Sequence, residues 1–315
     1  MDSFAGRLAV VTGGGTGMGR ELVIQLATEG CSVAFCDLNP DTMRETALRA
    51  EKEAPPGTRI TTHVCDVSDA TQMNRFRDEV VEQHATDHVD LVFNNAGIGG
   101  GGSFVSGDQV EWERTFGVVW TGVYNGCRAF VPLLVAGTDG YLINTSSVNG
   151  FWAALGPGVP HTAYSAGKFA VKGFTEALLE DFRLNAPHVK AAVVMPGHIG
   201  TDIVINSMRI HGGTMLGEMT KEDIKAMRDS PLGRTLPPDA TDDEVRARVN
   251  MIGEFFRDAA PVSAAQAATI ILDGVRNGEW RILVGDDAHK LDEAVRKDPL
   301  GAYGPEGLSL STFVG

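Results

Sequence analysis

TGGGTGMG occupies Thr12–Gly19, between a short apolar run and an amphipathic run with helical spacing. Glycines let the chain turn tightly after a strand, and they let a pyrophosphate approach main-chain N–H groups at a helix start. The spacing is T-G-x-x-x-G-x-G, because the sixth residue counted from Gly13 is Met18 rather than a glycine. We therefore predict a nucleotide-binding turn that uses Gly13, Gly15, Thr16, Gly17, Met18 and Gly19.

Outward from this turn, short β-branched runs alternate with helical patterns as far as Thr201. We expect strands at Arg7–Thr12, Ser32–Asp37, Arg59–Val64, Val89–Phe93, Tyr141–Ser146, Val189–Met195 and Trp280–Val284. We expect helices at Gly17–Gly30, Pro40–Ala54, Ala70–Gln83, Val110–Ala136, Tyr164–Asn185 and Ser263–Val275. This order predicts an α/β fold, a doubly wound and mostly parallel seven-stranded sheet of the Rossmann type.

The alternation stops in the charged segment Asp202–Pro261, which has helical stretches at Lys221–Arg228 and Asp242–Arg257. We expect residues 202–261 to form a helical lid inserted before the last helix and strand. Residues 285–315 are weakly patterned and form a C-terminal extension. Since no linker separates two domains, residues 1–315 are expected to form a single domain.

The composition limits the partners. The chain has 41 acidic and 27 basic residues and a net charge of -14, which disfavours nucleic acid and anionic membranes. We find no signal peptide pattern at the N-terminus, and no apolar run long enough for a transmembrane helix. The four cysteines form no CxxC pair and favour free core thiols, which fits a cytoplasmic location.

Asp37 closes the second expected strand, with Leu38 after it. An acidic residue at this position accepts hydrogen bonds from ribose hydroxyls and repels a 2′-phosphate. The local sequence CDLNPD has no Arg or Lys for that phosphate, so we predict NAD as the cofactor rather than NADP. The alternative is that Asp37 only caps the following helix.

Tyr164 and Lys168 lie four residues apart, which places both side chains on one face of the expected helix. A phenol ionises near pH 10, and a neighbouring ammonium group favours its ionised form. The pair is frequent by chance, so its weight comes from the other motifs.

Those motifs occur in order: Thr12–Gly19, Asp66 in CDV, Asn94–Gly97 in NNAG, Ser146-Ser147, Tyr164-x-x-x-Lys168, and Pro196-Gly197 followed by Thr201. Together they resemble the short-chain dehydrogenase/reductase family, over about residues 5–203 and again over 263–284. The resemblance implies that Ser147, Tyr164 and Lys168 are catalytic, with Tyr164 as the general acid/base. It also implies cofactor contacts from Asp37, Leu38, Asp66, Val67, Asn95, Ala96, Gly97, Tyr164, Lys168, Pro196, Gly197, Ile199 and Thr201.

Two features depart from the family pattern. Val119 occupies the place of an asparagine that in the family helps to hold a water molecule beside the lysine, and valine cannot form that hydrogen bond. The stretch between Ser147 and Tyr164 is longer than the family usually has, so one wall of the substrate pocket is expected to differ. We place Trp152 in that wall and His198 near the substrate. No metal-ligand spacing is present.

These features predict an NAD-dependent alcohol dehydrogenase or ketone reductase that acts on an apolar secondary alcohol or its ketone. The resemblance also implies a homodimer or homotetramer, with subunits meeting at Val110–Ala136 and Tyr164–Asn185. Two alternatives remain: a cofactor-binding sensor with little catalysis, which Val119 favours, and other chemistry such as imine reduction or a lyase step.

Overall fold

A computed structural model describes the chain except residues 2, 213–223, 226–227, 229–236, 238 and 314–315. Seven parallel strands form its main sheet in the order β3-β2-β1-β4-β5-β6-β9. The strands are β1 Leu8–Thr12, β2 Ser32–Asp37, β3 Ile60–Val64, β4 Leu91–Asn94, β5 Gly140–Thr145, β6 Val189–Pro196 and β9 Arg281–Val284. The predicted doubly wound, seven-stranded Rossmann sheet is confirmed.

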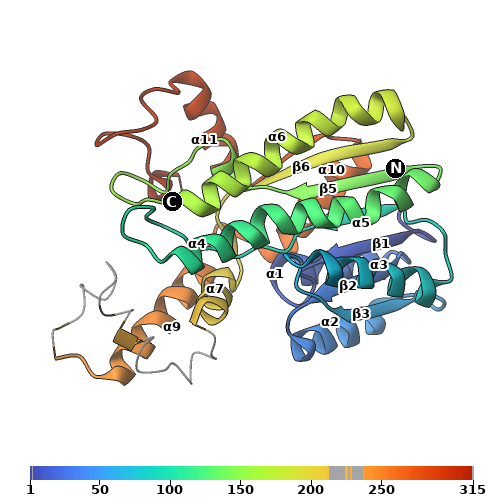
Figure 1. The fold of residues 1–315 in the computed structure, drawn as a ribbon, viewed down its shortest axis with the longest axis horizontal. Helices are drawn as coiled ribbons and strands as arrows, with labels where there is room; N and C mark the ends of the chain where they lie inside the picture. The colour runs from blue at the N-terminus through green and yellow to red at the C-terminus, as the bar shows by residue number, and fades with distance from the viewer. Residues whose placement is uncertain (2, 213–223, 226–227, 229–236, 238, 314–315) are drawn as a thin grey trace.

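Helices cover both faces of this sheet (Figure 1). One face packs against α1 Gly17–Thr28, α2 Pro40–Glu53 and α10 Ala264–Asn277. The other packs against α3 Ala70–His84, α5 Gly122–Ala136 and α6 Thr162–Asn185.

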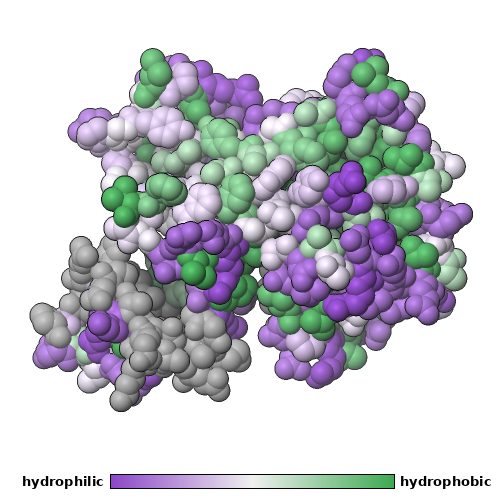
Figure 2. Space-filling model, in the orientation of Figure 1, coloured by the Kyte–Doolittle hydropathy of each residue, from purple (hydrophilic) through white to green (hydrophobic). Residues whose placement is uncertain are grey.

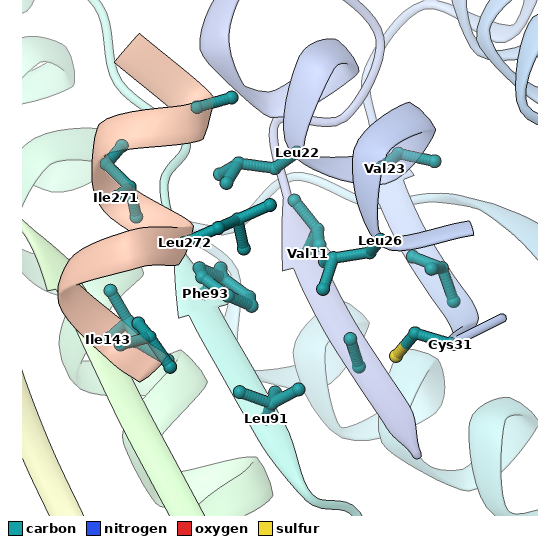
Figure 3. Packing of buried hydrophobic residues seen from close by; sticks show 14 of the residues in the cluster. Val11, Leu22, Val23, Leu26, Cys31, Leu91, Phe93, Ile143, Ile271 and Leu272 are labelled. Atoms are coloured by element: carbon teal, nitrogen blue, oxygen red, sulfur yellow. The ribbon is translucent and has the colours of Figure 1, made fainter. Parts of the chain in front are cut away.

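Alternate residues of each central strand supply the two cores. Val11, Phe93 and Ile143 face α1 and α10, where they meet side chains such as Leu22 and Leu272 (Figure 3). Their sequence neighbours, among them Val10, Val92 and Leu142, face the opposite helices. Because both faces are covered, these strands are apolar throughout. The packed sheet holds the carboxyl ends of β1, β2, β4, β5 and β6 along one edge.

The helix expected over Val110–Ala136 begins at Gln109 and is not regular. It consists of α4 Gln109–Phe116, a π-helical turn at Gly117–Thr121, and then α5. A π turn carries one extra residue and is frequently found beside functional sites. By length and composition Gln109–Ala136 could span a membrane, but 56% of its most apolar window is buried inside the structure, as in a core helix.

Within Asp202–Pro261 the structure describes α7 Ile203–Gly212 and α9 Asp242–Asp258, and α9 agrees with the stretch expected at Asp242–Arg257. The stretch Lys221–Arg228 lies largely outside the described residues. A two-stranded sheet, β7 Ile199–Gly200 with β8 Val262–Ser263, ties the start of this segment to its end.

The tail is more ordered than its weak pattern indicated. It forms α11 Asp286–Lys297 and a short 3₁₀ turn at Leu310–Thr312. Acidic residues begin α11 and basic residues end it, which suits the helix dipole. Its apolar side, with Ala288 and Leu291, packs against Val148 and Trp152 in a third core cluster.

Candidate active site

The glycine-rich turn connects β1 to α1 and is too tight for side chains at several positions. Gly13 and Gly17 have φ angles of +69° and +55°, which favour glycine. A Cβ at Gly19 would lie only 2.0 Å from the carbonyl oxygen of Gly13. The first turn of α1 carries no acidic residue. Its free N–H groups and positive dipole end therefore suit an anionic pyrophosphate.

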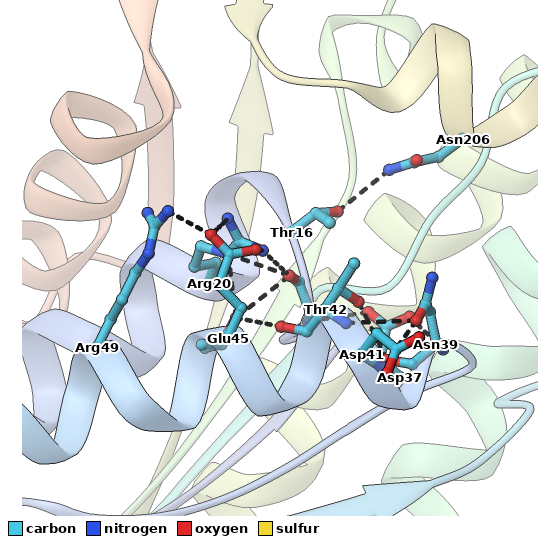
Figure 4. Close-up of polar contacts among 11 residues, drawn as sticks. Thr16, Arg20, Asp37, Asn39, Asp41, Thr42, Glu45, Arg49 and Asn206 are labelled. Carbon is cyan, nitrogen blue, oxygen red and sulfur yellow. Dashed lines mark hydrogen bonds and ion pairs between the residues drawn. The ribbon is translucent and has the colours of Figure 1, made fainter.

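Asp37 ends β2 directly beside this turn. Its Oδ2 accepts a hydrogen bond from the Gly15 N–H at 2.9 Å, and its Oδ1 accepts one from the Leu38 N–H at 2.7 Å. Arg20 lies nearby, but its guanidinium donates to the Gly15 carbonyl at 2.7 Å and pairs with Glu45 at 3.1 Å (Figure 4). The nearby cation is thus already held, and Asp37 keeps acceptor capacity for hydroxyl groups.

Thr12 organises the NNAG segment, a role that sequence reasoning missed. Its hydroxyl accepts hydrogen bonds from the N–H groups of Asn95 at 3.0 Å and Ala96 at 3.1 Å. The Asn95 amide donates to the Thr12 carbonyl, while Asn95 Oδ1 is buried without a partner among the described residues. This free acceptor fits a site that receives a polar ligand. The signal was a threonine that ends an otherwise apolar strand.

Just after β3, Asp66 Oδ1 accepts hydrogen bonds from the backbone N–H and the hydroxyl of Ser68. Val67 packs against Gly122, where a Cβ would approach the Val67 side chain to 2.6 Å. A Cβ at Gly97 would lie 3.7 Å from Lys168 Nζ. The NNAG segment therefore reaches the predicted catalytic lysine.

The predicted catalytic residues come together where β5 ends and α6 begins. Lys168 is buried, and its Nζ donates to the Thr145 carbonyl at 2.8 Å and lies 5.4 Å from the centre of the Tyr164 ring. The Ser147 hydroxyl lies next to Tyr164 and also accepts a hydrogen bond from the Asn149 N–H at 3.2 Å. Ser146 instead donates to the Lys168 carbonyl at 2.7 Å, a structural contact that distinguishes the two serines.

Burial is the main influence on the pKa values of Tyr164, Lys168 and His161. It raises the pKa of Tyr164, although a hydrogen bond from Ser147 opposes the rise. It lowers the pKa of Lys168 to about 7. The lowering of the tyrosine pKa that the neighbouring lysine led us to expect is not found in the protein alone, where burial is the largest influence. His161, whose ring centre is 4.7 Å from that of Tyr164, has its pKa lowered by burial to about 4 and is neutral near pH 7.

Val119 lies in the π turn and is fully buried against α6. A Cβ at Gly167 would stand 2.8 Å from Val119 Cγ1, so the two helices are in close contact between Tyr164 and Lys168. The valine thus fills its place with apolar packing.

The segment Pro196–Thr201 is held by distant parts of the chain. The Gly197 N–H donates to the Val284 carbonyl at 3.0 Å, and Ile199 pairs with Val262 in the small sheet. Thr201 packs against the glycine-rich turn, since a Cβ at Gly17 would lie 3.2 Å from its Cγ2. This segment therefore joins the nucleotide turn to the C-terminal half.

The two residues predicted to contact substrate, Trp152 and His198, are both engaged by other parts of the protein. Trp152 is 0% exposed, and its Nε1–H donates to the Ala302 carbonyl at 3.1 Å, so it supports the inserted loop from within the C-terminal core. The His198 ring shares a hydrogen bond with the Phe256 carbonyl at 2.7 Å and packs on the Phe256 ring. An indole buries a large apolar area, which explains why Trp152 lies in the core rather than facing a cleft. Within the described residues, no three His, Cys, Asp or Glu side chains group as a metal site.

The model of the short chain dehydrogenase family matches residues 7–209. The chain belongs to the short-chain dehydrogenase/reductase family. It is 32% identical over 297 residues to the putative oxidoreductase SadH of Mycobacterium tuberculosis. The aligned residues cover 94% of this chain and 92% of that protein. It is 30% identical to the levodione reductase of Leifsonia aquatica, over 65% of this chain and 74% of that protein.

Solved structures agree with this fold. A short-chain dehydrogenase/reductase from Burkholderia phymatum in complex with NAD has a TM-score of 0.75 at 23% identity, and the match covers 97% of this chain and 98% of that one. A metagenomic short-chain oxidoreductase in complex with NADP has a TM-score of 0.54 at 28% identity, over 62% and 83% of the two chains. Proteins of this fold thus hold either nucleotide, and as a member of the family this chain is an oxidoreductase.

Proposed function

We propose that this short-chain dehydrogenase/reductase interconverts an apolar secondary alcohol and its ketone, with NAD as cofactor. The main support is the group at the carboxyl end of β5. Ser147 and Tyr164 present two hydroxyl groups side by side, and the Lys168 amine lies 5.4 Å from the tyrosine ring. Two adjacent hydroxyls offer hydrogen bonds to one substrate oxygen, which positions it for proton transfer.

In this proposal Ser147 holds the substrate oxygen and Tyr164 moves the proton. In the direction of ketone reduction, the phenol donates its proton to the carbonyl oxygen, and in alcohol oxidation the phenolate takes the hydroxyl proton. A bound nicotinamide nucleotide supplies or accepts the hydride at the carbinol carbon. Lys168, tethered by the Thr145 carbonyl, stabilises the phenolate through its charge.

The preference for NAD rests on Asp37. Its carboxylate is held by the N–H groups of Gly15 and Leu38, so its negative charge stays beside the glycine-rich turn. Arg20, which bonds to the glycine-rich turn, is engaged by Glu45 and the Gly15 carbonyl. A 2′-phosphate would meet a negative charge there and lack a free cation.

The test combines a substrate screen with one substitution. Purified protein is mixed with NADH or NADPH and a panel of ketones, and with the oxidised nucleotides and alcohols, while nucleotide absorbance is followed. We expect turnover of apolar ketones with NADH, and a loss of about 100- to 10,000-fold in kcat for Tyr164→Phe with NADH binding retained. Tyr124→Phe, on the exposed side of α5, is the matched control. Full activity of Tyr164→Phe would overturn the proposal.

Val119 favours a second candidate, a nucleotide-binding sensor, because it removes the polar side chain expected beside the lysine. The same screen separates the two functions. Tight NADH binding with no turnover across the panel would favour the sensor, and turnover of an imine without any ketone would favour other chemistry at the same site.

We also propose a homo-oligomer formed through α5 and α6. Figure 2 shows apolar residues gathered over these helices, and Val135, Phe169 and Leu184 are exposed there. Contiguous exposed apolar surface of this kind is typical of subunit interfaces. Light scattering after size-exclusion chromatography measures the oligomeric state directly.

The four buried free thiols support a reducing, cytoplasmic location.

A further inference from the structure

A buried carboxylate from the C-terminal extension lies against the Pro196–Thr201 segment. Asp287, in the first turn of α11, is 3% exposed, and its Oδ2 accepts a hydrogen bond from the backbone N–H of His198 at 2.6 Å. Its Oδ1 is buried without a partner among the described residues. A carboxylate in this setting is costly to bury, so the bond to His198 is the contact that offsets the cost.

Two glycines make room for this carboxylate. A Cβ at Gly197 would lie 2.2 Å from Asp287 Oδ2, and a Cβ at Gly285 would lie 2.4 Å from Oδ1. Any side chain at Gly197 would therefore displace the carboxylate or the segment. The closeness shows that Asp287 and the Pro196–Thr201 backbone fit each other as a pair.

The same segment is fastened from a second direction. The Nε2–H of the His198 imidazole donates to the Phe256 carbonyl at 2.7 Å, near the end of α9. Its backbone is held by α11 and its side chain by α9, so His198 has little freedom. Both anchors lie outside the region 7–209 that the family model matches.

Asp287 does not act as an ordinary helix cap. Its carboxylate receives the N–H of His198, 89 residues away, rather than an N–H of its own helix. Asp286, the preceding residue in the same first turn, is exposed. The favourable interaction with the helix dipole is therefore available to both residues, and only Asp287 reaches the segment.

We propose that Asp287 is a positioning residue that holds Pro196–Thr201 in the conformation that binds the nicotinamide end of the cofactor. This inference rests on the proposed function. It assigns to Asp287 a role in nucleotide affinity and none in proton transfer, because its bond is to a backbone N–H and Tyr164, Ser147 and Lys168 are held by other contacts.

The first test is a pair of substitutions at adjacent positions. Asp287→Ala should weaken NADH binding, measured by fluorescence titration, by about 10- to 100-fold, the loss expected for one charge-assisted hydrogen bond. KM for the nucleotide should rise in parallel while kcat changes by less than about threefold. Asp286→Ala removes the same charge from the same turn and should leave both within about twofold. A fall in kcat with unchanged nucleotide KM would overturn the proposal.

The second test is a double-mutant cycle, which measures the coupling between Gly197 and Asp287 rather than the loss in either single variant. Gly197→Ala should weaken NADH binding strongly when Asp287 is present, because the new methyl meets the carboxylate. It should weaken binding much less in the Asp287→Ala background, where that space is open. Independent, additive effects of the two changes would show that the pair is not coupled and would overturn the proposal.

Hydrogen exchange in the free protein separates this inference from the proposed function. The amide of His198 should exchange faster in Asp287→Ala than in the unsubstituted chain and in Asp286→Ala. An unchanged exchange rate at His198 would overturn the proposal that Asp287 holds the Pro196–Thr201 segment. If the unsubstituted protein binds neither NADH nor NADPH, the proposed function fails, and faster exchange would still confirm that Asp287 holds the segment.

Discussion

The glycine-rich turn and the Pro196–Thr201 segment lie along the same edge of the sheet, after β1 and β6, but largely different parts of the chain hold them. The turn has a bond within its own βαβ unit, where the Gly15 N–H donates to Asp37, 22 residues away, and one from α7, where the Asn206 amide donates to the Thr16 hydroxyl at 3.1 Å. The segment is fixed at His198 by Asp287 and Phe256, which are 89 and 58 residues away. The turn therefore keeps a bond within the first strands and helix, whereas the bonds at His198 both come from the C-terminal elements.

The largest effect that bears on this comparison is expected from Trp152→Ala. Trp152 is fully buried in the core that Leu291 and Ala302 share with it. Removing a buried tryptophan should lower the free energy of unfolding by about 3–5 kcal/mol, measured by urea denaturation. Trp280→Ala, at a half-exposed position beside β9, is the control and should cost much less. Equal losses would mean that the C-terminal core around Trp152 adds no more stability to the fold than a half-exposed position does.

Gly19→Ala addresses the other half of the site. The new Cβ would lie 2.0 Å from the Gly13 carbonyl oxygen and 2.7 Å from the Asn95 side-chain nitrogen, which leaves it no room. We expect NADH binding to weaken by more than about 100-fold, since the turn has to shift away from the pyrophosphate. Gly173→Ala, where a Cβ in α6 has nothing within 4 Å, should leave binding unchanged and stabilise the helix by up to about 1 kcal/mol.

The same contrast explains which features the sequence could predict. Some features depend on residues that are close together in the sequence, so their patterns can be recognised there. These are the glycine spacing, the aspartate that ends a strand and the Tyr–Lys pair. Asp287 carries no such signal, because its partner His198 is distant and only the fold brings them together. The sequence predicts Trp152 in the substrate wall, and it carries no signal that the indole is buried with its N–H donating to the distant Ala302 carbonyl. The ordered tail escaped prediction since the core that α11 packs against comes from another part of the chain.

Asp37→Ser tests whether the first region alone sets the choice of nucleotide. The serine keeps a polar group for the ribose and removes the charge that repels a 2′-phosphate. We expect the NAD to NADP preference, measured as the ratio of kcat/KM values, to fall by about 10- to 100-fold, which corresponds to about 1.4–2.7 kcal/mol. Asp41→Ser, in the first turn of α2 and exposed, is the control. An unchanged ratio would move the selectivity to another part of the site.

The smallest effect is expected at Lys168, which lies next to Gly97 and the predicted nucleotide site. It is the change in the free energy of unfolding per unit of pH. The pKa of Lys168 is about 7 in the folded protein against an ordinary value of 10.5. Between these values the unfolded chain binds more protons than the folded one, so stability should rise with pH. Lys168→Met removes this titration. The unfolding free energy of the unsubstituted protein minus that of the variant should therefore rise by about 1.4 kcal/mol per pH unit above pH 7.

Below pH 7 the lysine is protonated in both states, so the same difference should be constant there, which gives an internal control. Subtracting the variant also removes the contribution of the groups that titrate in the alkaline range and do not interact with Lys168. A difference that stays flat from pH 7 to pH 10 would show that Lys168 keeps an ordinary pKa despite its burial. The ammonium would then be fully charged at neutral pH, and its Coulomb effect on Tyr164 would be larger than the buried geometry indicates.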